Sequence, residues 1–168
     1  MGDTISAGTT FINAATAYDA FGDDRKALAL FEKARAVYER GGASPELMGG
    51  LYNNMALTCA AMGRYAEALE LYDKAEEQMK LAECGEPELA ITCLNRADAL
   101  SALKGDAAER EINALLDEAY ALLDSPKIPR DGYYAFVCEK CAPAFSHYGY
   151  FLAAGELEKR AREIYERS

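Results

Sequence analysis

Four glycines recur at a nearly constant spacing along this chain. Gly22, Gly63, Gly105 and Gly149 lie 41, 42 and 44 residues apart. Each falls between two stretches whose apolar residues recur every three or four positions, the pattern of an amphipathic helix. A tight turn between two helices favours glycine, because its backbone adopts left-handed torsion angles without strain. The spacing therefore predicts four helical hairpins stacked as a solenoid.

Prolines mark the same period on the other side of each hairpin. Pro45, Pro87 and Pro129 are spaced 42 and 42 residues apart, and proline suits the first turn of a helix because its missing N–H has no partner there. Ser44 is a candidate N-cap for the first of these helices. We expect helices over about 8–21, 24–40, 45–62, 65–81, 87–104, 107–123, 130–148 and 151–167. Pro143 lies inside the seventh helix and predicts a kink near that point.

Positions counted from the turn glycines carry the same residue types in three of the four hairpins. Small residues at these positions let neighbouring helices approach closely, and the large residues Phe31 and Tyr72 fill the space between them. The shared small residues are Ala15, Ala56 and Ala142, then Ala27, Ala68 and Ala154, and finally Ala34, Ala75 and Ala161. The third hairpin needs about two extra residues after its turn glycine before Ile112, Leu116 and Ala119 come into register.

Composition limits the classes of partner. The chain has 168 residues and a net charge of −10, so the phosphates of nucleic acid and the surface of anionic membranes would be repelled. It has no apolar run near the ~20 residues that a membrane-spanning helix needs, and no secretory signal pattern. The five cysteines are odd in number and scattered through helical stretches, which is unlike a disulfide framework. We expect a protein of the reducing cytoplasm.

The repeat resembles the tetratricopeptide repeat (TPR). The best stretch is LYNNMALTCAAMGRYAEALELYDKAEE, residues 51–77, and the period of 41–42 resembles the long variant found in kinesin light chains. The residues that carry the resemblance are Gly63, Tyr65, Ala68, Tyr72 and Ala75. It implies an all-α, right-handed solenoid of four helix-turn-helix repeats and eight helices. Residues 1–168 would then form a single domain, with repeats near 8–41, 45–82, 87–124 and 130–167.

An asparagine recurs midway along the first helix of three repeats. Asn13, Asn54 and Asn95 are spaced 41 and 41 residues apart, and Lys140 takes the corresponding place in the fourth repeat. The resemblance implies that first helices line a concave groove, where asparagine either bonds neighbouring helices or holds the backbone of an extended ligand. An amide can do either, because it has two donors and an acceptor. The expected ligand-groove residues are Ile12, Asn13, Thr16, Asn53, Asn54, Leu57, Asn95, Ala99, Glu139 and Lys140.

The stretch VCEKCAPAFSHYGY raises the question of a metal or redox site. A structural zinc site takes four ligands, and only Cys138, Cys141 and His147 are evident. On a helix of 100° per residue the two cysteines share a face, while His147 lies about 180° from Cys138. The cysteines also stand where other repeats place Phe11, Tyr52 and Met55. We interpret them as core cysteines and His147 as a surface or turn residue. We expect no metal and no cofactor.

The function predicted is binding of a protein or peptide in the concave groove, without enzymatic activity. No phosphate-loop motif and no acid–base pair of carboxylates appears. One alternative is a self-associating structural segment that forms a homodimer through the N-terminal hairpin, where Phe11 and Ile12 are adjacent. Another is the C-terminal part of a longer TPR regulatory protein, because the last helix is apolar along one narrow stripe only. A metal or thiol site in the last hairpin is a less favoured alternative.

Overall fold

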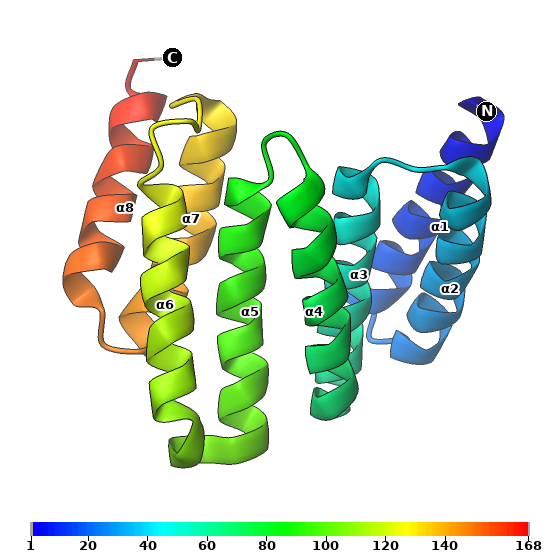
Figure 1. The fold of residues 1–168 in the computed structure, drawn as a ribbon, viewed down its shortest axis with the longest axis horizontal. Helices are drawn as coiled ribbons and strands as arrows, with labels where there is room; N and C mark the ends of the chain where they lie inside the picture. Colours follow the sequence, from blue (N-terminus) through cyan, green and yellow to red (C-terminus); the bar gives the residue numbers. More distant parts are fainter. Residues whose placement is uncertain (1, 168) are drawn as a thin grey trace.

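Within the residues that it describes, the computed structural model is built from α-helices and one short 3₁₀ helix. It describes the backbone of residues 2–167 and the side chains of residues 4–167. The helices are α1 (Gly2–Ala20), α2 (Asp24–Gly41), α3 (Pro45–Ala61), α4 (Tyr65–Leu81), α5 (Glu86–Lys104), η1 (Gly105–Ala108), α6 (Glu109–Leu123), α7 (Gly132–His147) and α8 (Phe151–Tyr165). They stack as successive hairpins in one row, with the two ends of the chain at opposite ends of it (Figure 1). The all-α solenoid predicted from the repeats is confirmed.

The turn glycines adopt the conformation that the sequence predicts. The backbone angle φ is +76° at Gly22, +74° at Gly63, +55° at Gly105 and +83° at Gly149. Gly42, with φ of +64°, ends α2 in the same way. A side chain with a Cβ atom is strained at these angles, so the repeated glycines fix the places where the chain reverses.

Capping residues define where α3 and α7 begin. Ser44 accepts a hydrogen bond from the backbone N–H of Leu47 at 3.5 Å, as predicted for the N-cap of α3. The prediction that Pro129 opens the seventh helix is wrong. Asp131 is the N-cap there, accepting from the N–H of Tyr134 at 3.0 Å, and α7 begins one residue later. A strong side-chain cap therefore moved the start of α7 three residues beyond the proline.

The first helix begins earlier than the sequence pattern indicates, at residue 2 instead of about residue 8. Its first turns lie against the end of α2. A methyl group added at Gly41 would lie 3.1 Å from a methyl of Thr4 and 3.2 Å from one of Ile5, and Gly8 lies directly against the ring of Tyr38. These contacts join segments that are far apart in the sequence, so local periodicity could not reveal them.

The irregular third hairpin is explained by η1. This 3₁₀ segment lies between α5 and α6 and supplies the extra residues that the repeat register demands. Ile112, Leu116 and Ala119 are buried in α6 as expected. In the fourth hairpin, α7 continues through Pro143 for four more residues.

Two clusters of buried side chains form the core. One joins α1–α4 and includes Ala99 of α5, and the other joins α5–α8. The prediction that small residues lie at helix contacts is confirmed, because all nine of the shared alanines are at most 4% exposed. Phe31 and Tyr72, each 1% exposed, fill the space between them.

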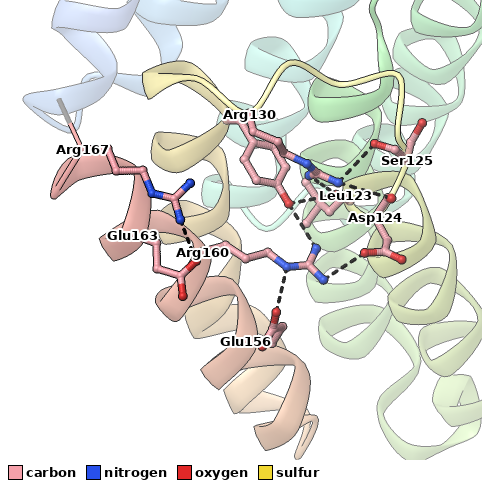
Figure 2. A network of polar contacts seen from close by, with 9 residues as sticks. Leu123, Asp124, Ser125, Arg130, Glu156, Arg160, Glu163 and Arg167 are labelled. Carbon is pink, nitrogen blue, oxygen red and sulfur yellow. Dashed lines mark hydrogen bonds and ion pairs between the residues drawn. The ribbon is translucent and has the colours of Figure 1, made fainter.

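A polar network fastens the last hairpin to the end of α6 (Figure 2). Arg160 of α8 donates to the hydroxyl of Tyr134 at 3.1 Å, to Asp124 at 2.9 Å and to Glu156 at 3.1 Å. Arg130 donates to the last carbonyl of α6 at 2.8 Å, which satisfies an acceptor that the helix end leaves free. The fourth hairpin is therefore held by charged hydrogen bonds as well as by apolar packing.

Candidate functional site

The expected groove residues lie on the first helices of the hairpins, α1, α3, α5 and α7. This side is called the first-helix face, and each contact between neighbouring first helices is called a seam. At the seam of α1 and α3, Thr58 donates to Asp19 at 2.7 Å. Asn13 and Thr16 are exposed, and the Thr16 hydroxyl donates to the carbonyl of Ile12 in its own helix at 3.0 Å. The side chain of Ile12 is half-buried against the core.

The seam of α3 and α5 is closed by amide hydrogen bonds. Asn95 donates to the side-chain oxygen of Asn53 at 3.2 Å, and the buried hydroxyl of Thr92 donates to the same oxygen at 3.4 Å. Asn54, the register equivalent of Asn95, is half-buried, and its side chain makes no hydrogen bond within residues 4–167. Leu57 beside it is 38% exposed. Equivalent asparagines therefore do different things in neighbouring repeats.

The seam of α5 and α7 opens into a hollow of about 520 Å³. Lys140 and Asn95 stand among its lining side chains, and Lys140 forms no ion pair with any carboxylate of the described side chains. The lining is completed by Ile91, Leu94, Asp98, Cys141, Pro143, Ala144 and His147. This seam thus presents a cation, a carboxylate and an amide beside apolar side chains.

Polar groups at one end of this hollow are fixed by a tyrosine. The hydroxyl of Tyr148 donates to Asp98 at 2.7 Å. Burial, together with that carboxylate, raises the pKa of Tyr148, so the phenol keeps its proton and remains a donor at neutral pH. The exposed ring of His147 stands edge-on to Tyr148, with 4.8 Å between ring centroids. Sequence reasoning placed His147 at the surface but missed Asp98 and Tyr148.

Two of the expected groove residues lie elsewhere. Ala99 is 2% exposed and belongs to the core of α1–α4, so it offers no surface to a ligand. Its neighbour Asp98 lines the hollow instead, and the 41-residue register running through Thr16 and Leu57 leads to that position. Glu139 accepts a hydrogen bond from Tyr165 of α8 at 3.3 Å and faces α8, away from the hollow of α5 and α7.

The cysteines of α7 are core residues, as interpreted from the sequence. Cys138 is 0% and Cys141 1% exposed. Burial raises the pKa of Cys141 to about 12 and also raises that of Cys138, so both thiols stay protonated and are poor nucleophiles. Among the described side chains, no three His, Cys, Asp or Glu residues are placed to hold a metal ion. No helix in the described part of the chain is long and apolar enough to cross a membrane.

Comparisons with known proteins place this arrangement among helical repeats. Residues 50–75 match the tetratricopeptide repeat family, and no curated protein matches the sequence. The structure is similar to BtubC (BKLC) from P. vanneervenii, with a TM-score of 0.63 and 18% identity over 95% of this chain. The chain spans 63% of that protein's length.

A second similar structure comes from Podosopora anserina, a protein with nearly identical TPR-like repeats described as a putative kinesin light chain. Its TM-score is 0.57 at 21% identity, over 95% of this chain and 75% of the other. A variant of that protein with one substituted residue gives a TM-score of 0.60 at 22% identity, over 96% and 77% of the two chains. At these identities the likeness concerns the fold. It agrees with the long repeat period seen in the sequence.

Proposed function

We propose that this chain, which has the tetratricopeptide repeat fold and a matching repeat at residues 50–75, binds an extended segment of a partner protein along its first-helix face. Proteins with this fold generally mediate protein–protein interactions. The observation that carries the proposal is the hollow of α5 and α7, in which Lys140 lies beside apolar side chains and forms no ion pair among the described side chains, while the carboxylate of Asp98 in the same lining accepts from Tyr148.

The chemistry of this face suits a peptide backbone with one apolar and one acidic side chain. The ammonium group of Lys140 can accept a carboxylate or a backbone carbonyl as its partner. The free amide of Asn54 can pair with both the N–H and the C=O of an extended strand. Leu57, which is partly exposed, and Leu94, which lines the hollow, offer apolar contact. In this proposal the amides of Asn53 and Asn95, which bond one another, hold α3 and α5 together and do not contact the ligand.

The same proposal treats the chain as one non-enzymatic binding unit with a protein or peptide partner. Its net charge of −10 disfavours nucleic acid and anionic lipid. All five cysteines are free thiols, which fits a reducing compartment such as the cytoplasm.

Capture from native cell lysate tests this proposal when the variants are compared in parallel. Immobilised Lys140→Glu should retain at least tenfold less of the specific partner than the unchanged protein, and Asn54→Ala should retain less to a smaller degree. Lys159→Glu, an exposed charge reversal on α8, is the matched control and should retain the partner fully. If Lys140→Glu retains every specifically captured protein as well as Lys159→Glu does, this binding site is wrong.

Self-association through the N-terminal hairpin is a second candidate function. Phe11 and Ile12 are half-buried against the core, but Phe21 at the turn of α1 and α2 is 89% exposed and Tyr18 beside it is 40% exposed. Sedimentation at high micromolar concentration should show a dimer that Phe21→Ser dissociates. A monomer at that concentration would dispose of this candidate.

A further inference from the structure

A second hollow lies between α6 and the beginning of α8, on the side of the second helices. Its volume is about 720 Å³. This hollow has no lining residue in common with the one between α5 and α7. The lining residues come from α6, from the turn before α8 and from its first turn, with Asp117, Tyr120, Tyr150, Phe151 and Leu152 as those that matter below.

Packed aromatic rings form the floor of this hollow, and two large apolar side chains lie exposed at its edge. The buried ring of Phe145 lies edge-on to Tyr120 at 6.0 Å and tilted against Tyr150 at 6.2 Å, measured between ring centroids. Next in sequence, Phe151 is 69% exposed and Leu152 is 93% exposed. Adjacent apolar side chains at the edge of a preformed apolar hollow are typical of an interaction site.

The equivalent place in the first half of the chain is different. Between α2 and α4 the hollow measures only about 130 Å³. Charged side chains line it, including Glu32 and Arg35, which form an ion pair at 2.6 Å. The large apolar hollow therefore does not follow from the repeat itself.

Charge at the rim indicates the chemistry of the occupant. Asp117 and Asp124 lie seven residues apart, two turns of α6, and both line the hollow. Asp124 is paired with Arg160 at 2.9 Å. Asp117 is exposed and forms no ion pair among the described side chains, where its polar neighbour is the hydroxyl of Tyr150. One carboxylate beside the apolar surface is therefore left without a cation.

We propose that this hollow docks a basic amphipathic segment of a partner protein, with its apolar side chains on Phe151 and Leu152 and a Lys or Arg on Asp117. The distance between the two rim aspartates corresponds to about 10 Å along α6, so the occupant needs only about two helical turns. The acidic balance of the whole chain favours the approach of such a segment. This site stands independently of binding on the first-helix face.

Selection from a random peptide display library on the immobilised protein tests the proposal without a known partner. The selected peptides should be rich in Lys and Arg, with apolar residues three or four positions apart. Fluorescence anisotropy of the tightest synthetic peptide should show at least a tenfold loss of affinity for Leu152→Asp and about a fivefold loss for Asp117→Lys. Leu81→Asp, at another exposed leucine on α4 (71% exposed), is the matched control and should change affinity less than twofold.

The outcome also separates this site from the first-helix face. Lys140→Glu should leave the affinity of these peptides unchanged. The proposal is overturned if no selected peptide weakens on Leu152→Asp, or if those that weaken are acidic. It is also overturned if sedimentation shows a dimer that Leu152→Asp dissociates, because the occupant is then a second copy of the chain. Melting curves confirm that each variant is folded, and Leu152→Ser replaces any Leu152→Asp protein that is not.

Discussion

Two neighbouring seams on the first-helix face use the same repeat position for different purposes. At the seam of α3 and α5, Asn95 is bonded to Asn53, and Thr92 shares the acceptor. At the seam of α5 and α7 the equivalent position holds Lys140, which forms no ion pair in the described part of the chain, and the helices leave a hollow of about 520 Å³. The repeat register decides where a side chain stands. The neighbouring residues decide whether that side chain forms hydrogen bonds within the fold or keeps its polar group available to a ligand.

The largest effect is expected from opening a cavity in the core that joins α5–α8. Phe145 is 0% exposed, so Phe145→Ala should lower the free energy of unfolding by about 3–5 kcal/mol. Because α1–α4 have a core of their own, hydrogen exchange should accelerate chiefly in α7 and α8. Phe31→Ala is the matched variant in the other core and should show the reverse pattern. If both variants lost protection from hydrogen exchange equally along the whole chain, the division into two cores would be wrong.

Removing the hydrogen bonds of Arg160, which join the fourth hairpin to the end of α6, should have the next largest effect on stability. The side chain of Arg160 is only 21% exposed and donates hydrogen bonds to three residues of the network in Figure 2, Tyr134, Asp124 and Glu156. Arg160→Ala should lower the free energy of unfolding by about 2 kcal/mol, measured by urea denaturation. Arg167→Ala, at a side chain that is 77% exposed and paired at 3.8 Å, should cause no measurable change. Matching curves for both variants would contradict a structural role for the network.

Adjacent asparagines in α3 allow the comparison of seams within one helix. Asn53→Ala removes an acceptor used by two donors of α5 and should lower stability by about 1–2 kcal/mol. Asn54→Ala should change it by less than about 0.5 kcal/mol, because its side chain has no hydrogen bond to lose within residues 4–167. Thermal unfolding of the two variants measures the difference. Equal melting temperatures would mean that the amide bonds of this seam contribute nothing to the fold.

The smallest expected effect is on the rate of thiol labelling, which reports whether the seam of α5 and α7 stays packed in solution. Cys84 is exposed in the loop between α4 and α5, whereas Cys141 lines the hollow but is only 1% exposed. Burial holds the pKa of both Cys141 and Cys93 at about 12, so at pH 8 neither forms an appreciable thiolate. Native protein should therefore react rapidly at Cys84 alone. Rapid labelling of Cys141 would show that the seam of α5 and α7 opens in solution.

Most of the fold could be predicted because its determinants are local and repeated. Turn glycines with positive φ, small residues at helix contacts and the N-cap at Ser44 each leave a signature within a few residues. The early start of α1 depends on Tyr38 and Gly41 in α2, and the late start of α7 depends on Asp131 outweighing Pro129 as a start signal. Contacts across the hairpin and competition between two start signals are not visible in a periodic pattern.

The repeat spacing could predict which positions lie at the candidate site, but not which side chains surround each of them. The 41-residue spacing located Asn54 and Asn95, and the corresponding place in the fourth repeat located Lys140. The same spacing, followed from Thr16 through Leu57, would have selected Asp98 in place of Ala99. Spacing cannot say that Asn95 finds an acceptor in Asn53 while Lys140 finds no carboxylate. The hollow beside Phe151 and Leu152 was missed for a related reason. It lies between α6 and the first turn of α8, two segments that only the three-dimensional packing of the last hairpin brings together.

The most direct test measures the melting temperature and the retention of a captured partner protein on the same three proteins. These are the unchanged chain, Asn95→Ala and Lys140→Glu. Asn95→Ala should melt at a lower temperature, because the α3–α5 seam loses its amide bond. Lys140→Glu should melt as the unchanged chain does and retain at least tenfold less partner. The opposite assignment, with Lys140→Glu unstable and still binding or Asn95→Ala stable and unable to bind, would contradict the division between a packing seam and a binding seam.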